Sequence, residues 1–194
     1  MRKIVVAVSG ASGAIYAKAV LDKLMSARNQ WTEIGLVMTQ NAAEVWEMEL
    51  EDKTYNAYGL PVHSQRDFAA PFASGSGQFD TMIIVPCSMG ILGRITSGIS
   101  NDLITRAADV ILKERRKLIC VVRETPYNLI HIRNMETLTL AGGIVCPATP
   151  SFYSKPATIE QLVSTVADRI LDLAGIRINT YRWGSPAYPS EQED

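Results

Sequence analysis

Short apolar runs rich in valine and isoleucine alternate with amphipathic stretches along this chain, and no other feature of the sequence constrains the fold as strongly. The alternation is typical of βα units, in which parallel strands are buried between helices. The apolar runs predict strands at Lys3–Val8, Glu33–Met38, Thr81–Val85, Leu118–Arg123 and Gly143–Cys146. The amphipathic stretches predict helices at Ala14–Ala27, Gln40–Leu50, Met89–Thr96, Asn101–Glu114, Leu129–Leu140 and Ile159–Leu173. The expected fold is therefore a three-layer α/β structure, with a parallel sheet between two layers of helices.

A single domain accounts for most of the chain, because 194 residues with 47% hydrophobic content can bury one sizeable core. We expect this domain to cover residues 1–178 and a C-terminal extension to cover residues 179–194. The weakest pattern lies in residues 51–78, where glycine, proline and serine predict a long loop with at most one short strand. Pro156 and Thr158 mark the start of the last helix.

The charge and the cysteine and histidine counts exclude several classes of function. A net charge of −1 gives no field that would gather nucleic acid or an anionic membrane. No apolar run reaches the ~20 residues of a membrane span. The three cysteines lie in or beside apolar runs, which is typical of reduced thiols in the cytoplasm. With two histidines and no paired metal-binding motif, we expect no metal site.

The residues directly after each strand are the candidate site, because ligands of an open parallel sheet bind at the carboxyl ends of its strands. After the first strand, Ser9–Gly13 are small residues that open a helix, whose free N–H groups favour an anion. The segment lacks the full Gly-x-Gly-x-x-Gly pattern, and no acidic residue follows the second strand at Thr39, which disfavours NAD. A tight turn that needs small residues only for packing is the alternative.

A second small-residue helix start, Pro86–Gly90, follows the third predicted strand and is another candidate phosphate site. Ser88 is expected to be the N-cap of that helix and a ligand donor. Cys87 has no histidine near it in the sequence, so a small buried residue is favoured over a nucleophile.

Two charged pairs follow further along the chain. Arg106 and Lys113 lie seven residues apart on the fourth predicted helix, which places both on one face. Because apolar residues surround Arg106, it is expected to have an anionic partner. Arg123 and Glu124 stand at the ligand edge, where Arg123 could hold a phosphate. Glu124 could donate or accept a proton if partial burial raises its pKa.

Two residues near the end of the domain each have two interpretations. Tyr153 could fill the core or contact a ligand. Arg169 could bind a ligand or pair with Asp172 on its own helix.

Seven motifs occur in order along nearly the whole chain: Ser9–Ala14, Ala73–Ser76, Pro86–Gly90, Leu103–Val110, Leu112–Arg116, Arg123–Pro126 and Phe152–Tyr153. Together they resemble the flavin prenyltransferase (UbiX) family, whose members were formerly called aromatic acid decarboxylases. The resemblance implies a flavodoxin-like, Rossmann-type fold, a homododecamer, and active sites built where subunits meet. It implies that the dimethylallyl group of dimethylallyl phosphate is joined to N5 and C6 of reduced FMN without a metal. The product, prenylated FMN, would serve a partner decarboxylase.

The resemblance also implies roles for individual residues. The FMN-binding residues would be Gly10, Ala11, Ser12, Thr39, Ser88, Met89, Gly90, Ile91 and Arg123. The prenyl phosphate would be held by Arg106, Lys113, Tyr153 and Arg169, with Phe68 over the allyl group. Glu124 would protonate the leaving phosphate or shuttle protons, Glu49 would assist proton removal, and Ser12 would lie between them. The Gly10–Gly13 turn then becomes the floor under the flavin ring.

The chain departs from the family pattern in three places. Ile91 stands where threonine is common, which removes a possible hydroxyl contact to the FMN phosphate. Phe68 stands where some members carry tryptophan, which weakens stabilisation of a cation by a ring face. Asn101-Asp102 replaces the common Asp-Asn or Asn-Asn, and the sequence assigns no consequence to this change.

Two other functions remain as alternatives. The first is an FMN-dependent decarboxylase of the cysteine-oxidising type, whose chemistry depends on a catalytic histidine; His63 and His131 are the two candidates. The second is a non-catalytic carrier of FMN. The sequence also leaves open whether the prenyl donor is a monophosphate or a diphosphate.

Overall fold

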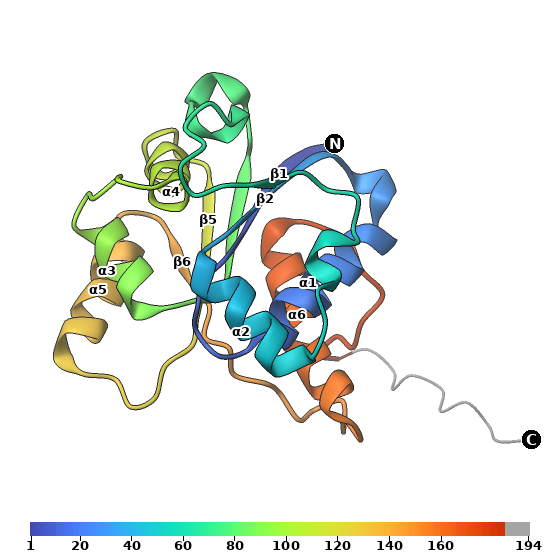
Figure 1. The fold of residues 1–194 in the computed structure, drawn as a ribbon. Helices are drawn as coiled ribbons and strands as arrows, with labels where there is room; N and C mark the ends of the chain where they lie inside the picture. Colours follow the sequence, from blue (N-terminus) through green and yellow to red (C-terminus); the bar gives the residue numbers. More distant parts are fainter. Residues whose placement is uncertain (185–194) are drawn as a thin grey trace, which may run out of the picture.

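A six-stranded parallel sheet forms the centre of the computed structural model, which describes residues 1–184 (Figure 1). Its strands are β1 (Arg2–Val8), β2 (Trp31–Met38), β3 (Val62–His63), β4 (Thr81–Cys87), β5 (Lys117–Val122) and β6 (Ile144–Val145). They lie in the order β3-β2-β1-β4-β5-β6, which is the Rossmann order. Without the short edge strand β3, the remaining five strands have the flavodoxin order. The strand order reverses between β1 and β4, where ligands of such sheets bind.

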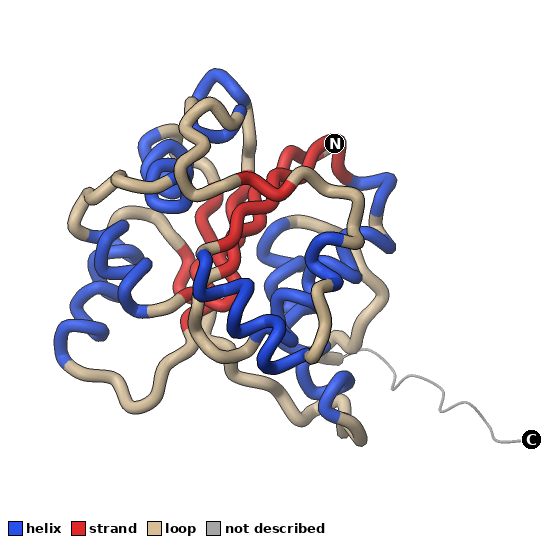
Figure 2. The backbone as a smooth tube through the Cα atoms, in the orientation of Figure 1, coloured by secondary structure: helices blue, strands red, loops and turns tan. Residues whose placement is uncertain are grey.

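Helices cover both faces of this sheet, as Figure 2 shows. One face carries α1 (Ala14–Ser26), α2 (Gln40–Leu50) and α6 (Ile159–Ala174), and the other carries α3 (Met89–Thr96), α4 (Leu103–Lys113) and α5 (Leu129–Leu140). Alternating side chains of β1 explain the two layers. Ile4 and Val6 pack into the core under α1 and α6, whereas Val5 and Ala7 pack into the core under α3 and α4. The predicted three-layer α/β fold is confirmed.

The helices begin where short polar side chains can bond the free N–H groups of the first turn. The N-cap residue, which directly precedes each helix, is Thr39 for α2, Ser88 for α3, Asp102 for α4, Asn128 for α5 and Thr158 for α6. The predicted N-cap at Ser88 and the predicted helix start at Thr158 are therefore confirmed. These caps fix the direction in which each helix leaves the sheet edge.

Small differences from the predicted boundaries occur at the strand ends. β4 continues through Pro86 to Cys87, whereas β5 ends at Val122, so Arg123 lies outside the strand. The long loop between α2 and β4 contains only the short strand β3 and single helical turns at Thr54–Asn56, Pro71–Ala73 and Gly75–Gly77. The three cysteines are buried and free, as expected.

The expected extension at residues 179–194 is described only as far as residue 184. Its residues 185–194, which include Pro186 and Pro189, lie outside the described residues. The described part packs on α6, where the Arg182 guanidinium forms two hydrogen bonds with the Asp172 carboxylate at 3.0 and 2.8 Å. The division between a domain and an extension stays a prediction.

Candidate functional site

Backbone hydrogen bonds beyond the strands hold the carboxyl ends of the sheet in one row. The Thr39 N–H donates to the carbonyl of Val8, and the Arg123 N–H donates to the carbonyl of Cys87, at 3.0 and 3.2 Å. The next bond in the row joins Ala148 to Val122 at 2.9 Å. These bonds place the residues that follow β2, β1, β4, β5 and β6 side by side. The sequence expectation that these strand ends meet at one edge is confirmed.

Ser9 joins the ends of β1 and β4, the two strands at which the strand order reverses. Its hydroxyl donates to the Pro86 carbonyl at 2.7 Å and accepts from the Ser88 N–H at 2.9 Å. The side chain is buried, so these bonds are shielded from water. Ser9 thereby fixes the spacing between the two small-residue turns. The sequence marked Ser9 only as a small residue, because its partners lie 77 and 79 positions away.

The anion at the end of the Gly10–Gly13 turn is a side chain of the same chain, the Glu49 carboxylate. Both carboxylate oxygens of Glu49, at the end of α2, accept from the Gly13 N–H, at 3.1 and 2.9 Å. One of them also accepts from the Ala14 N–H at 2.7 Å. A carboxylate at this position is favoured by the free N–H groups and the dipole of α1. The interpretation of this helix start as an open phosphate site is therefore wrong, because Glu49 already occupies its N–H groups.

Close packing explains the glycine at position 10. A Cβ atom built on Gly10 would lie 2.6 Å from the Cβ of Asn41, at the start of α2. Thr39 caps the same helix, since its hydroxyl accepts from the Ala42 N–H at 2.9 Å. The turn after β1 and the start of α2 thus lie in direct contact. Both the packing role and the ligand role that the sequence allowed for this turn remain compatible with its geometry.

The start of α3 has more open space. The Ser88 hydroxyl accepts from the Ile91 N–H at 3.4 Å, so that N–H already has a partner. A Cβ atom built on Gly90 would meet no atom within 4 Å. A ligand can therefore approach the backbone closely at Gly90, while Ser88 and Ile91 hold the turn.

Arg123 and Glu124 are both exposed at the end of β5. Arg123 lies near the Tyr16 phenol of α1: burial raises the pKa of Tyr16, and the positive charge of Arg123 opposes that rise. The Glu124 carboxylate accepts from the Thr125 N–H at 2.9 Å. The expected partial burial of Glu124 does not occur among residues 1–184 of the single chain, where its side chain is exposed.

Arg106 and Lys113 lie on α4, and Arg106 contacts the segment before β4. The Arg106 guanidinium donates to the Ala73 carbonyl at 3.0 Å and pairs with Asp109 at 3.5 Å, which confirms the expected anionic partner. Lys113 lies 3.8 Å from Glu114. It precedes β5, whereas Glu124 follows that strand, and the six residues of β5 span roughly 20 Å. One chain therefore does not bring Lys113 and Glu124 together.

The apolar side of α4 is covered within the chain. Leu103, Ile104, Ala107 and Ala108 are all fully buried against the sheet. An apolar helix face of this kind can pack inside one subunit or between subunits. Packing inside the subunit accounts for it, because β4 and β5 supply the other half of the core.

Tyr153 lies on the surface and contacts the described part of the C-terminal extension. Its ring packs edge-to-face against Trp183, with centroids 5.1 Å apart and planes at 74°. Tyr153 is 68% exposed, so the interpretation as a core filler is wrong. The sequence did not single out Trp183, because nothing local connects it with a residue thirty positions earlier.

Arg169 lies on α6 near the end of β6. Burial raises the pKa of Cys146, and the charge of Arg169 opposes that rise, which places the guanidinium close to this strand end. Asp172 pairs with Arg182 at 2.8 Å. The alternative that Arg169 pairs with Asp172 is therefore wrong. Within the described residues, Arg169 has no carboxylate within ion-pair distance.

Phe68 lies in the loop after β3, His63 is the last residue of the edge strand β3, and His131 lies in α5. Phe68 is 47% exposed in the loop after β3. His63 is hydrogen-bonded to Asp67 at 2.9 Å, and this bond is the main cause of the lowered pKa of Asp67. The His131 N–H bonds the Asn128 side chain at the start of α5. Neither histidine is among the residues that directly follow β1, β2, β4, β5 or β6.

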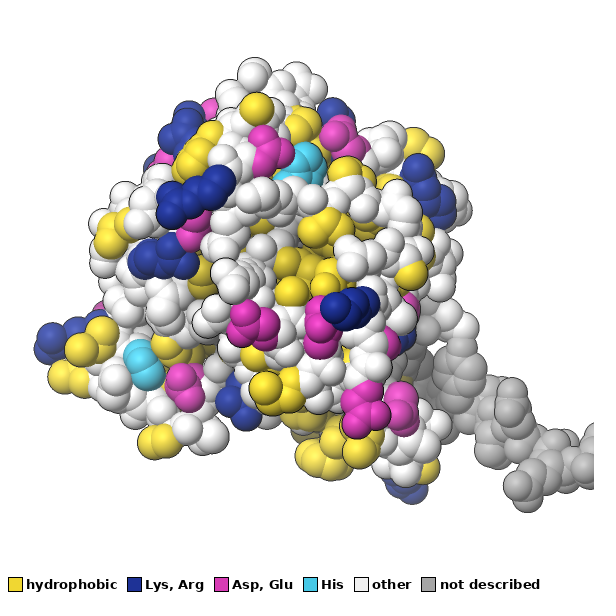
Figure 3. Space-filling model, viewed as in Figure 1, with side chains coloured by type: hydrophobic (Ala, Val, Ile, Leu, Met, Phe, Trp, Pro, Cys, Tyr) yellow, Lys and Arg dark blue, Asp and Glu magenta, His cyan; other side chains and the backbone are white. Residues whose placement is uncertain are grey.

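Several large apolar side chains are exposed on α5. Leu129 is 59% exposed, Ile130 67%, Ile132 50% and Leu140 82%. Figure 3 shows apolar side chains on the surface at this end of the molecule. A patch of this kind commonly marks a protein interface. Within residues 1–184, no helix is long and apolar enough to cross a membrane, and no cluster of potential metal ligands occurs.

The strand order and the small-residue turns at the switch point define a flavodoxin-like nucleotide-binding protein. Residues 1–171 match the model of the family described as Flavoprotein. The chain is 40% identical over 186 residues to flavin prenyltransferase UbiX of Methanocaldococcus jannaschii, covering 94% of this chain and 99% of the relative. It is 44% identical over 176 residues to the Thermoplasma acidophilum protein of the same name, covering 90% and 95%. The chain therefore belongs to the flavoprotein family and, within it, to the UbiX flavin prenyltransferases.

Solved structures give the same result. A structure described as AnUbiX in complex with FMN and dimethylallyl pyrophosphate has a TM-score of 0.85 and 43% identity, covering 93% of this chain and 99% of the other. A dodecameric FMN-dependent UbiX-like decarboxylase from Escherichia coli has a TM-score of 0.89 and 38% identity, covering 94% and 100%. The FMN-dependent cysteine decarboxylase SpaF has a TM-score of 0.59 at 19% identity, covering 86% and 98%, and shares the fold alone.

Proposed function

We propose that this chain is a metal-independent flavin prenyltransferase. It transfers the dimethylallyl group of dimethylallyl phosphate to N5 and C6 of reduced FMN and so makes prenylated FMN for a partner decarboxylase. The observation that carries this conclusion is identity of about two residues in five, over nearly the full length, with proteins of that activity. Reduced FMN supplies the nucleophilic ring atoms, and the protein supplies binding, orientation and charge.

We assign the flavin to the row of strand ends. We name the Ser9–Gly13 turn together with Glu49 the flavin floor. Its small side chains allow a flat ring to approach the backbone, and the open space at Gly90 allows the same beside α3. Ala11, Ser12, Thr39, Ser88, Met89, Ile91 and the exposed Arg123 complete the proposed FMN site. Because Glu49 already bonds the start of α1, the FMN phosphate belongs at the start of α3 and beside Arg123 rather than at this turn.

The prenyl phosphate belongs to what we name the phosphate set: Arg106, Lys113, Tyr153 and Arg169. Several cations and a phenol around a departing phosphate stabilise the transition state more than the ground state. Arg106 and Lys113 lie on α4, on one face of the sheet, whereas Arg169 lies on α6, on the other face. We infer that subunits of an assembly complete each site, as the exposed apolar residues of α5 and the dodecameric E. coli relative support.

The remaining roles concern protons and the allyl group. Glu124 is exposed beside Arg123 in the single chain, and we propose that it protonates the leaving phosphate or shuttles protons once a neighbouring subunit covers it. Glu49 holds the turn that contains Ser12, so it can accept a proton beside the flavin floor when the second ring bond forms. Phe68 offers a ring face to the allyl group once a neighbouring subunit covers its exposed side.

A cytoplasmic location is part of this proposal. The three cysteines of the chain are buried and free, which suits a reducing compartment. The recipient decarboxylase is a separate protein, so the product must leave the site intact.

Anaerobic incubation of the purified protein with reduced FMN and dimethylallyl phosphate tests the proposal. Mass spectrometry of the released flavin should show the addition of one five-carbon unit. Parallel reactions with the diphosphate donor, with oxidised FMN and with added chelator identify the donor and check independence from metal. A protein that binds FMN yet adds no five-carbon unit with either donor would contradict the transferase and favour an FMN carrier.

A further inference from the structure

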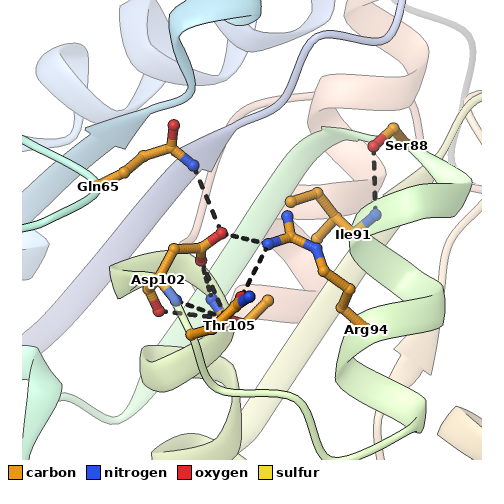
Figure 4. A network of polar contacts seen from close by, with 7 residues as sticks. Gln65, Ser88, Ile91, Arg94, Asp102 and Thr105 are labelled. Atoms are coloured by element: carbon orange, nitrogen blue, oxygen red, sulfur yellow. Dashed lines mark hydrogen bonds and ion pairs between the residues drawn. The ribbon is translucent and has the colours of Figure 1, made fainter.

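Asp102 is buried where three elements that carry proposed site residues meet, as Figure 4 shows. It is the N-cap of α4, the helix that carries Arg106. It pairs with Arg94 on α3, the helix whose first turn follows Ser88. It also accepts from the Gln65 side chain at 3.5 Å, in the loop that carries Phe68. One carboxylate therefore contacts three elements at once.

The two oxygens of this carboxylate have different partners. Oδ1 accepts from the Thr105 N–H at 2.8 Å and from the Thr105 hydroxyl at 3.0 Å, which forms the cap of α4. Oδ2 accepts from Arg94 and from Gln65. Burial alone would raise the pKa of Asp102, but the hydrogen bonds from Thr105 and Arg94 outweigh burial and lower it. The group is therefore an anion at neutral pH.

The chain carries Asn101-Asp102 where the family commonly has Asp-Asn or Asn-Asn, and the two sets of partners show what the carboxylate at position 102 does. An asparagine at position 102 could still cap α4 with its single carbonyl oxygen. Its NH2 group would then face Arg94 and Gln65, which also donate hydrogen bonds, so neither of them would have an acceptor at this position. Only the carboxylate can cap α4 and bind Arg94 together. Arg94 also donates to the Asn101 side chain at 3.2 Å, so both residues of the departure bind it.

The loop of Phe68 is held at the same place by a second bond. The Leu103 N–H, at the start of α4, donates to the Gln65 carbonyl at 2.8 Å. The loop then reaches Phe68 within three residues. A shift at the start of α4 would therefore move this loop as well.

We propose that Arg94 and Asp102 are positioning residues for prenyl transfer, which hold the FMN helix α3, the phosphate helix α4 and the Phe68 loop in one arrangement. The proposal rests on the proposed function, since it acts through residues assigned to that reaction. Neither side chain needs to touch the flavin or the prenyl donor. The pair sets the relative position of groups that do.

The unequal exposure of the two side chains makes the pair testable. The Asp102 side chain is 9% exposed, whereas that of Arg94 is 33% exposed and lines a cavity of about 190 Å³. Asp102→Asn leaves an arginine that can reach water. Arg94→Met leaves a buried carboxylate without its cation, which destabilises the protein more. The double variant removes both charges and should recover most of that lost stability.

The experiment measures the thermal midpoint, the Kd for FMN and kcat/KM for dimethylallyl phosphate in the assembled enzyme. We expect Asp102→Asn to lower kcat/KM about tenfold, because misplaced groups lose rate steeply, while the Kd for FMN changes less than about threefold. Ile34→Val, in the core under β2, is the matched control: it should lower the midpoint by roughly 2–4 °C and leave kcat/KM unchanged. The double variant should have a higher thermal midpoint than Arg94→Met, but its kcat/KM should stay as low as that of Asp102→Asn.

Two results would overturn the proposal. In the first, Asp102→Asn behaves like Ile34→Val, with kcat/KM unchanged. In the second, kcat/KM of the double variant recovers together with its midpoint, which would make the pair purely structural. A wild-type protein that forms no prenylated FMN overturns the proposed function and this inference with it. An active wild type with unaffected variants overturns this inference alone.

Discussion

The flavin floor and the phosphate set differ in how much of each site one chain completes. The flavin floor is closed by its own chain, because Ser9 joins two strand ends and Glu49 bonds the Gly13 and Ala14 N–H groups. The phosphate set is spread over the surface. Lys113 precedes β5, and Tyr153 lies beyond β6 with 68% of its surface exposed.

The difference teaches where assembly is needed. A flat ring can rest on adjacent strand ends, which the sheet brings together in any folded subunit. A small, highly charged group requires cations on several sides, and one sheet edge offers only one side. We therefore expect substitutions in the phosphate set to affect turnover more than flavin binding, and substitutions in the flavin floor to affect folding as well.

The largest expected effect is that of Glu124→Gln. Removing a positioned proton donor should lower kcat by about 10²–10⁴-fold. FMN binding should persist, since in the described part of the chain the Glu124 side chain bonds its neighbouring Thr125 N–H and no part of the flavin floor. Rapid anaerobic mixing with detection of the prenylated product measures the first quantity, and FMN titration measures the second. Full activity would remove Glu124 from the mechanism.

The next effect is that of Arg106→Ala, which removes one cation from the phosphate set. We expect kcat to fall by about 10²–10³-fold, as for the loss of one transition-state donor. Subunits of this variant should complement subunits carrying Ser12→Ala, because some mixed sites would contain both intact residues. Activity is measured after dissociation, mixing and reassembly, with each variant reassembled alone as the control. A mixture no more active than its components would show that one chain completes the site.

A smaller effect is expected in the flavin floor from Ser9→Ala. The change leaves the buried Ser88 N–H without its 2.9 Å partner, which should lower the free energy of unfolding by about 1–3 kcal/mol. It should also weaken FMN binding, because the spacing of the β1 and β4 turns is no longer fixed. Denaturant unfolding and FMN titration measure the two changes. Ser26→Ala, at an exposed hydroxyl on α1, should stay within about 0.5 kcal/mol of the wild type.

The smallest expected effect is the loss, at acidic pH, of the stability that the Asp102 carboxylate contributes at the start of α4. Because the pKa of Asp102 is lowered in the folded protein, its contribution to stability is present above the pKa of an unfolded aspartate and is lost as pH falls through the folded pKa. Arg94, Gln65 and Thr105 bond this carboxylate, and Arg94 is the charged group among them; Arg66 is a second charged residue that lines the same cavity.

Unfolding curves of the wild type and Asp102→Asn should therefore converge as the pH is lowered below about 4. Acid-sensitive groups elsewhere, such as Asp52 and Asp67, are present in both proteins and cancel in the difference. A stability difference that stays constant from neutral to acidic pH would show that the charge of Asp102 does not contribute.

Local patterns were sufficient to predict the elements of this fold. Apolar runs of strand length and amphipathic stretches of helix length are properties of neighbouring residues, so β1, β2 and β5 lie within two residues of their predicted bounds. Capping is also local, which is why Ser88 and Thr158 could be predicted as helix starts. The meeting of strand ends at one edge follows from parallel βα units themselves.

The connections across that edge could not be read in the same way. Glu49 looks like Glu44, Glu47 and Glu51 in the sequence, and only its position at the end of α2 brings it to the α1 turn. Ser9 and Asp102 gain their meaning from partners on other elements. The sequence by itself determined the strands, the helices and the family motifs, because these depend on neighbours in the chain. Only the tertiary structure shows which of several similar residues, such as the glutamates of α2, holds the site together, because those contacts join residues far apart in the sequence.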